Sequence, residues 1–294
     1  MSPDPKGGHA LDHILACIDA SPYSAGVVDL TAWLASRLSA SVELLHVIQR
    51  KDAVAARRDL SGAIGLGVKS GLLEELTRID EAEGKLAIER GRLLLQAGIE
   101  RLAAAGVAAV TPLHRHGGIV ETIIEREADA GLVVIGRRGA SGDFATDHLG
   151  SKVERVVRAS IRPVMVAPQT FTTPATAVIA HDGSALAEKA VRFVASSPLF
   201  RDMAVHLVHA GLDHASQRNR LARAVEVVGR SADKVEARVL SGDAERAIAA
   251  YATSVPGGML VMGAYGHSPL RRLIVGSTTT AMIRTVDAPI LLVR

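Results

Sequence analysis

The stretch Leu260–Thr280, LVMGAYGHSPLRRLIVGSTTT, decides the fold of this 294-residue chain. It begins with an apolar run that is typical of the end of a buried strand. Gly263 and Gly266 follow, and after nine further residues Gly276 and Ser277 precede a segment with helical potential. Glycines let a backbone approach a ligand closely, and free N–H groups at a helix start attract an anion. The spacing therefore predicts a phosphate-binding loop between a strand and a helix.

The same pattern occurs again at Gly136–Ser151, so the chain is an internal repeat of a βαβαβαβαβ unit. Alternating strands and helices predict a parallel sheet with helices on both faces. We therefore predict an α/β protein with two tandem, open, five-stranded parallel sheets of Rossmann-like type. The corresponding anchors are Asp19 with Asp182, His46 with His209, Gly136 with Gly263, and Gly150-Ser151 with Gly276-Ser277.

The repeat predicts a first domain at 10–168, with an insertion at about 49–90, and a second domain at 176–294. The segment PQTFTTPA, residues 168–175, links them. The predicted strands are His13–Ile18, Ser41–Ile48, Val107–Leu113, Gly131–Ile135, Pro163–Ala167, Thr176–Ala180, Ala204–Ala210, Val235–Leu240, Met259–Met262 and Pro289–Val293. The predicted helices are Val27–Leu38, 84–105, Ile119–Ala128, Lys152–Ala159, Ala187–Ala195, 213–231, Ala244–Ala252 and 278–286.

The amino-acid composition restricts the classes of protein to which this chain can belong. With 48% hydrophobic but only 3% aromatic residues, the core must be aliphatic, as in parallel α/β proteins. A net charge of +3 without a basic tract argues against nucleic acid as a partner. No run of about 18 apolar residues predicts a membrane span. The single cysteine, Cys17, excludes an internal disulfide, and the N-terminus does not resemble a secretory signal, so we expect a cytoplasmic protein.

Four features together resemble the universal stress protein family in its tandem two-domain form. They are the Gly-x2-Gly-x9-Gly-Ser motif at 263–277, which recurs with one extra residue at 136–151, the turn-borne Asp after strand one, LVHA in strand two and the closing PILLV. The resemblance covers nearly all of residues 10–294, less the insertion. It implies a stress-response protein that binds ATP, with or without Mg²⁺, and changes conformation or partner with its nucleotide.

The resemblance also implies which residues contact the adenine nucleotide. Asp182 would meet the ribose and adenosine side, and the backbone at Ala210 would meet the adenine. The phosphates would be held by Gly263, Gly266, Gly276, Ser277 and Thr278. The matching positions of the first half are Asp19, Val47, Gly136, Gly139, Gly150 and Ser151.

The first half departs from the family pattern, because ten residues rather than nine separate Gly139 from Gly150. Its loop also carries Asp143 and Asp147, which would repel a triphosphate unless a metal intervened. Arg137 and Arg138 could offset this charge. We therefore predict the better nucleotide site in the second half, while the first-half loop binds something else or is structural.

Several residues have simpler explanations than ligand binding. The two turn aspartates could be helix caps. His46 and His209 are expected to be packed, hydrogen-bonded histidines. His114 and His116 share a strand face, yet no third metal ligand is evident. Cys17 is expected to be buried and inert.

Two loop segments also have two possible interpretations each. The segment SGAIGLG in the 49–90 insertion is interpreted as a surface or interface loop, with a flexible lid as the alternative. Arg271 and Arg272 lie inside the second glycine loop, where they either face solvent or contact an anion.

Three functions compete at this point. The first is a nucleotide-binding regulatory protein, with at most slow ATP hydrolysis and no predicted catalytic residue. The second is an interaction or scaffold protein of the same fold that binds no nucleotide. The third is an adenylate-forming enzyme, which is disfavoured because its SGGxDS or HIGH/KMSKS signatures are absent. Neither a Walker A motif nor a Gly-x-Gly-x-x-Gly after a first strand occurs, which argues against P-loop ATPases and Rossmann dehydrogenases.

The closing strands PVMVA and PILLV predict how the halves assemble. They are short, apolar and expected at a sheet edge, where an exposed edge invites pairing. Because such strands join two domains in the family, we expect the two halves to pair with each other. Homodimer formation through the 49–90 insertion is a further hypothesis.

Overall fold

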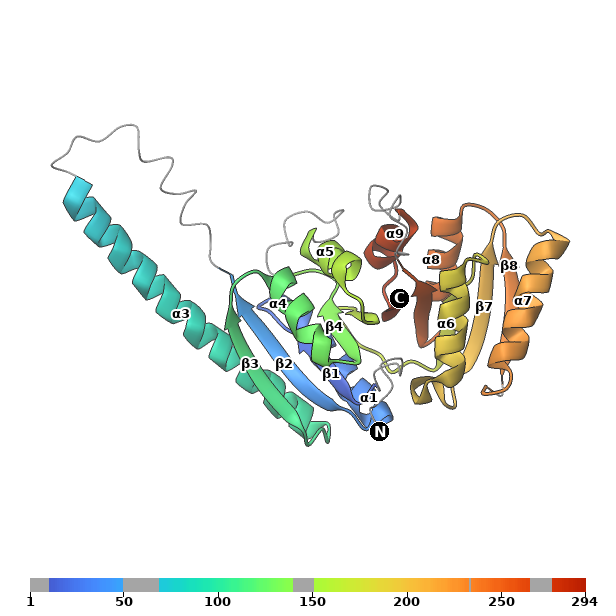
Figure 1. Ribbon diagram of the computed structural model, residues 1–294, viewed down its shortest axis with the longest axis horizontal. Helices are drawn as coiled ribbons and strands as arrows, with labels where there is room; N and C mark the ends of the chain where they lie inside the picture. The colour runs from blue at the N-terminus through green and yellow to red at the C-terminus, as the bar shows by residue number, and fades with distance from the viewer. Residues whose placement is uncertain (1–10, 50–68, 140–150, 233, 265–276) are drawn as a thin grey trace, which may run out of the picture.

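The computed structural model describes residues 11–49, 69–139, 151–232, 234–264 and 277–294. These residues form two α/β halves that share one sheet (Figure 1). The strands of the first half are β1 (His13–Cys17), β2 (Ser41–Ile48), β3 (Val110–His116), β4 (Leu132–Gly136) and β5 (Val164–Ala167). Those of the second half are β6 (Thr176–Ala180), β7 (Ala204–Ala210), β8 (Val235–Leu240), β9 (Gly258–Gly263) and β10 (Ile290–Val293).

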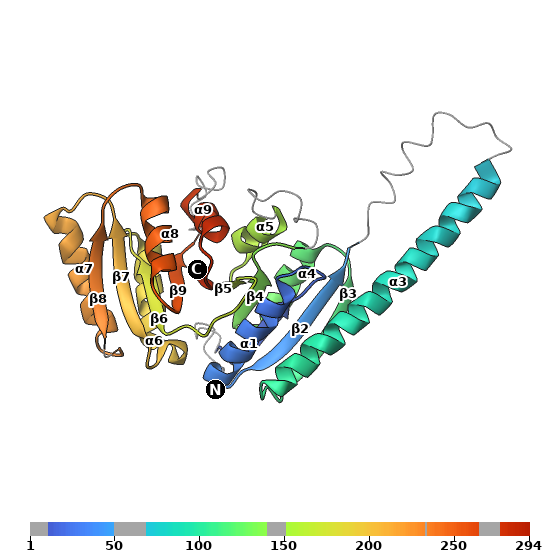
Figure 2. The ribbon, with the colours of Figure 1, turned by 180° about the vertical axis from the view of Figure 1, so that it is seen from behind.

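Helices cover both faces of the sheet, as the alternation of strands and helices predicts (Figure 2). The first half contains α1 (Ser24–Leu38), α3 (Lys69–Ala104), α4 (Ile119–Arg126), the 3-10 turn η1 (Glu127–Asp129) and α5 (Ser151–Ala159). The second half contains α6 (Ala185–Ser196), the 3-10 turn η2 (Pro198–Phe200), α7 (Ala215–Val228), α8 (Ala244–Ser254) and α9 (Ser277–Thr285).

The strand order repeats from one half to the other. The sheet runs β3-β2-β1-β4-β5-β10-β9-β6-β7-β8, so each half has the same order counted from its first strand. Within each half neighbouring strands are parallel. The predicted α/β class and the tandem sheets are therefore confirmed.

The halves join through their closing strands, which run antiparallel to each other. Met165 of β5 lies opposite Leu291 of β10, and the flanking pairs are Val166 with Ile290 and Val164 with Leu292. Every residue of β5 and β10 is buried. The apolar strands that would be exposed edges in an isolated half are thus the centre of a ten-stranded sheet, which removes the hazard of an unpaired apolar edge.

Alternate residues of the strands feed two apolar layers, one on each face. Ile14 and Ala16 of β1 belong to the layer under α1, α3, α6 and α7. Leu15 and Cys17 belong to the layer under α4, α5, α8 and α9. Each layer includes residues of both halves, so the core is continuous across the β5–β10 junction.

The linker between the halves packs against α1. A Cβ at Gly26 would approach the carbonyl oxygens of Pro168 and Gln169, the latter at 2.8 Å, so only glycine fits there. The rings of Trp33 and Phe171 lie 6.1 Å apart on the same side. Because α1 also reaches the second half, the two halves are held by more than one pair of strands.

The largest difference from the predicted elements is α3. The sequence predicts a helix at 84–105, whereas α3 begins at Lys69 and runs for 36 residues. Residues 69–83 contain four glutamates and three leucines, which are strong helix formers, and Glu75 and Arg78 pair at i,i+3 across 3.7 Å. The polarity of the residues before Gly84 therefore does not indicate a loop.

The third strand also starts later than predicted. It begins at Val110 rather than Val107, because the N–H of Val107 still bonds to the carbonyl of Leu102 at the end of α3. The strand then extends to His116, so it contains both His114 and His116. Other element boundaries differ from the predicted ones by a few residues.

Candidate nucleotide-binding site

The turn after the first strand has the same geometry in both halves. The carboxylate oxygen Oδ1 of Asp19 accepts the N–H of Ser21 at 3.0 Å, and Oδ1 of Asp182 accepts the N–H of Ser184 at 2.9 Å. These are Asx turns, in which an aspartate side chain fixes the backbone two residues on. The residues before α1 and α6 are Tyr23 and Ser184, so the hypothesis that the aspartates are helix caps is wrong.

The second strand of each half is tied to this turn by a histidine. The ring Nδ1 of His46 bonds to the carbonyl of Ile18 at 3.0 Å, and Nδ1 of His209 bonds to the carbonyl of His181 at 2.9 Å. Because a carbonyl only accepts, each Nδ1 carries the hydrogen. The prediction of packed, hydrogen-bonded histidines is confirmed.

These histidine bonds place two predicted adenine-side residues near the aspartate turns. Val47 follows His46 in β2 and is buried. Ala210 follows His209 at the end of β7 and is partly exposed. Both stand at the carboxyl end of the second strand of their half, the edge at which open parallel sheets bind ligands.

The first glycine of each loop is required by packing. A Cβ at Gly136 would lie 2.9 Å from Cβ of Tyr23, at the start of α1. A Cβ at Gly263 would lie 2.6 Å from the carbonyl carbon and Cβ of Leu186, in the first turn of α6. Both glycines let a helix start approach the end of the fourth strand, which is a reason for glycine that is independent of any ligand.

In the first half the aspartate turn meets the start of the glycine loop. A Cβ at Gly139 would lie 2.8 Å from Oδ2 of Asp19, and Oγ of Ser21 donates to the carbonyl of Arg138 at 3.4 Å. The expected convergence of these two segments is therefore present. It also means that a carboxylate faces the backbone where the loop begins.

Part of the predicted site lies outside the described residues. Ser151 and Ser277 are the first residues of α5 and α9, and Thr278 follows in α9, so both loops lead into a helix N-terminus. Gly150, Gly266 and Gly276 fall in the segments that the structure leaves undescribed, as do Asp143, Asp147, Arg271, Arg272 and the SGAIGLG segment.

Arg137 has a role that the sequence did not predict. This residue is 7% exposed, and its guanidinium donates to the carbonyl of Val286 and, at 3.1 Å, to Oδ1 of Asp287. Both partners belong to the connection between α9 and β10. The hypothesis that Arg137 offsets phosphate charge in the first half is thus corrected, because its hydrogen bonds join the two halves.

A different arginine lies at the second-half turn. Gly183, next to Asp182, has φ +80°, and a Cβ there would lie 3.0 Å from Cδ of Arg220. Arg220 projects from α7 and is exposed. Leu212, which is 75% exposed, follows the end of β7 nearby in the chain. The sequence signal that could have pointed to it is the set of arginines in the predicted 213–231 helix, Arg218, Arg220, Arg223 and Arg230.

The remaining reactive side chains form no second site in the described ranges. No group of three or more His, Cys, Asp or Glu with metal-binding geometry occurs among them. The rings of His46 and His114 lie 5.3 Å apart, and His114 and His116 are stacked at 6.2 Å. Burial, reinforced by Glu43 and Asp19, raises the pKa of the Cys17 thiol far above its ordinary value. This thiol is therefore buried and a poor nucleophile at neutral pH.

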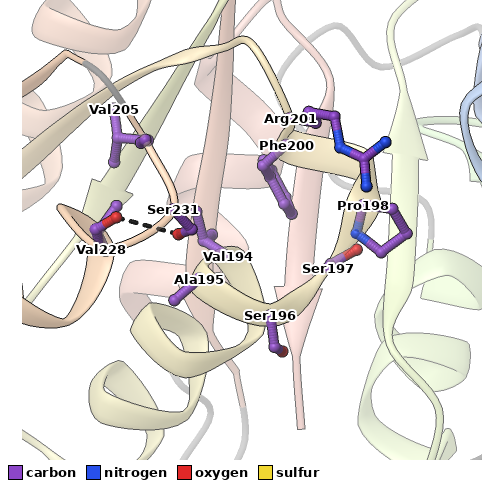
Figure 3. Close-up of a pocket in the computed structure, with 11 residues that line it drawn as sticks. Val194, Ala195, Ser196, Ser197, Pro198, Phe200, Arg201, Val205, Val228 and Ser231 are labelled. Carbon is purple, nitrogen blue, oxygen red and sulfur yellow. Dashed lines mark hydrogen bonds between the residues drawn. The ribbon is translucent and has the colours of Figure 1, made fainter.

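A pocket of about 360 Å³ lies away from the predicted site (Figure 3). Its walls come from the end of α6, η2, the start of β7 and the end of α7. Ser231 on its rim donates to the carbonyl of Val228 at 3.0 Å. The pocket is therefore at the amino end of β7, opposite the edge that carries Asp182 and Ala210.

Comparisons with known proteins agree with this architecture. The model of the universal stress protein family matches the chain twice, at residues 10–168 and 175–294. A universal stress protein of Synechocystis sp. is 33% identical over 287 residues, which cover 97% of this chain and all of that protein. The chain therefore belongs to the universal stress protein family.

Solved structures show the same fold. A universal stress protein from Archaeoglobus fulgidus has a TM-score of 0.72 at 22% identity, covering 97% of this chain and 98% of that chain. A putative universal stress protein from Pseudomonas aeruginosa has a TM-score of 0.61 at 16% identity, covering 97% and 93%. Separately, none of the helices described here is both long and apolar enough to cross a membrane.

Proposed function

We propose that this universal stress protein binds ATP at the carboxyl edge of its second half and acts as a nucleotide-dependent regulatory protein. The observation that carries the proposal is the matched pair of aspartate turns, each beside a glycine-ended fourth strand. In an open parallel sheet this edge is where ligands bind. Membership of the family and the glycine spacing of 263–277 support the same site.

The contacts of the proposed site follow from the elements that meet there. Asp182 contacts the ribose, and the backbone of Ala210 contacts the adenine, beside the exposed Leu212. The backbone of Gly263, Gly266 and Gly276 approaches the phosphates, and Ser277 and Thr278 offer N–H groups at the start of α9. The nucleotide binds with or without Mg²⁺.

Charge favours the second half over the first. In the first half the glycine loop carries Asp143 and Asp147, and the hydrogen bonds of Arg137 go to the other half. In the second half Arg220 lies against the turn that carries Asp182. A positive group near a polyphosphate stabilises it, whereas a carboxylate repels it. We therefore assign the first-half residues Asp19, Val47, Gly136, Gly139, Gly150 and Ser151 to a weaker site.

An interaction protein with two empty sites is the competing function. Nucleotide release separates the two: the purified protein is heat-denatured, and the supernatant is analysed by chromatography. ATP or ADP near one equivalent per chain supports the proposal, and calorimetric titration of the nucleotide-free protein then measures the affinity. Absence of nucleotide, together with no heat of binding at millimolar ATP, would refute it.

Two matched glycine variants test which half of the protein binds ATP. Gly276→Val is expected to block the phosphate approach and to weaken ATP binding by about tenfold or more, because charge-assisted hydrogen bonds are lost. The control is Gly150→Val, the same change at the corresponding position of the first half, which is expected to alter affinity much less. Equal losses in both variants would contradict the assignment to the second half.

A further inference from the structure

The N-terminal part of α3 stands away from the rest of the fold. Helix α3 packs on β2 and β3 through its C-terminal part, and its N-terminal part extends beyond the sheet (Figures 1 and 2). Its residues 74–90 are exposed, except for Leu76 and Ala87, which are partly exposed. A helix that is surrounded by water is marginally stable on its own. This segment is therefore a candidate for a partner.

Exposed apolar side chains follow a heptad repeat along α3. Ile79, Leu86 and Leu93 are seven residues apart, and their exposed fractions are 46%, 48% and 55%. A second set of positions lies three residues before each of these. It is occupied by Leu76, Glu83 and Arg90. Spacings of three and four residues are those of a coiled-coil seam. We call the line formed by Leu76, Ile79, Glu83, Leu86, Arg90 and Leu93 the α3 seam.

The α3 seam does not face the protein's own core. The side of α3 that packs on the sheet carries Gly91, Leu95, Gly98 and Leu102, all buried. At 3.6 residues per turn, Leu93 and Leu95 point about 160° apart. The seam is thus on the solvent side of a helix whose opposite side is already docked.

The distribution of charge along α3 indicates which partner fits the α3 seam. Residues 74–83 contain five acidic residues and one arginine, whereas residues 85–92 contain three basic residues and one glutamate. Two copies aligned in parallel would bring like charges together. Two copies aligned antiparallel would lay the acidic part of one on the basic part of the other.

We propose that two copies of this chain associate through an antiparallel coiled coil of their α3 seams. The two-fold axis passes near Gly84 and Lys85, the boundary between the acidic and basic parts. In this register Leu76 meets Leu93 of the second copy. Glu83 lies one helical turn from Arg90 of the second copy. An isologous contact of this kind closes at two chains. The pairing is separate from the β5–β10 junction and independent of nucleotide.

Sedimentation velocity of the full-length protein tests the pairing. The wild type is expected to sediment as a dimer at micromolar concentration. In this register position 86 faces Glu83 of the second copy, so Leu86→Glu removes two buried leucines per dimer and sets like charges opposite each other; it is expected to raise the dissociation constant at least about 100-fold. Ile88→Glu is the matched control, because Ile88 is 44% exposed but lies on the opposite side of α3. Far-UV circular dichroism and thermal unfolding check that both variants keep the fold.

A charge exchange tests the antiparallel register. Glu83→Lys and Arg90→Glu are each expected to weaken the dimer, and the double variant is expected to restore it, because the exchanged charges again attract each other one turn apart across the two helices. A monomeric wild type at hundred-micromolar concentration would overturn self-association. A dimer that survives Leu86→Glu, or that Ile88→Glu weakens equally, would overturn the seam. Lack of restoration by the double variant would overturn the register.

Discussion

Replacing Arg137 by methionine tests whether this arginine joins the two halves. Methionine keeps an apolar stem of similar shape but removes the guanidinium, so packing is largely preserved. The lost interactions are the hydrogen bond to the carbonyl of the buried Val286 and the bond to Asp287.

The magnitude follows from the exposure of the two partners. A hydrogen bond from a charged donor contributes about 1.5–3 kcal/mol. The carboxylate of Asp287 is 77% exposed, so its ion pair is screened and contributes at most about 1 kcal/mol. We therefore expect Arg137→Met to lower the free energy of unfolding by about 2–3 kcal/mol. Asp287→Asn, which keeps the Val286 bond, is expected to cost less than about 1 kcal/mol.

Urea denaturation followed by circular dichroism measures both changes, with ATP affinity measured in parallel. The affinity of Arg137→Met is expected to stay within about threefold of the wild type. The reasoning would be refuted if Arg137→Met unfolded like the wild type, if Asp287→Asn cost as much, or if Arg137→Met lost ATP binding while keeping its stability.

Three further outcomes follow from groups that are buried or partly buried. Burial, with smaller effects of His46 and His116, lowers the pKa of His114, so the unfolded chain binds its proton at higher pH than the fold does. The free energy of unfolding is therefore expected to fall as pH drops below about 6.5, down to the lower pKa of the folded state, and urea titrations of His114→Gln should show a shallower fall. Gly263→Ala places a methyl group 2.6 Å from Leu186 and is expected to cost about 1–3 kcal/mol; a thermal midpoint equal to wild type would show that α6 can shift without cost. Cys17 is expected to react with a thiol reagent only after unfolding, and fast labelling of the native protein at neutral pH would contradict its burial.

Much of the fold could be predicted from the sequence, because the repeat supplies each element twice. Runs such as Ser41–Ile48 and Ala204–Ala210 coincide with β2 and β7, since continuous apolar strands in a parallel sheet leave little choice of boundary. The start of α3 lies outside the predicted helix because charged residues dominate 74–83, where Leu76 and Ile79 are the only large apolar residues. Its heptad pattern is present in the sequence, but Leu76, Ile79 and Glu83 precede the helix predicted at 84–105.

The candidate site was less predictable than the fold. The turn aspartates and the two histidines were found because they recur at equivalent positions, and the structure gives each pair the same hydrogen bond. Arg137 and Arg220 differ, because their roles depend on contacts between elements distant in the chain. A motif shows that an arginine is near a loop, but only packing determines whether it faces a ligand or another domain.

ATP binding by the second half is the central claim, and calorimetric titration of the nucleotide-free protein tests it most directly. The protein is titrated with ATP beside Gly276→Val and Gly150→Val. The account predicts a saturable site in the wild type that Gly276→Val weakens about tenfold or more and that Gly150→Val leaves nearly unchanged. No binding by the wild type, or the same affinity in all three proteins, would contradict it.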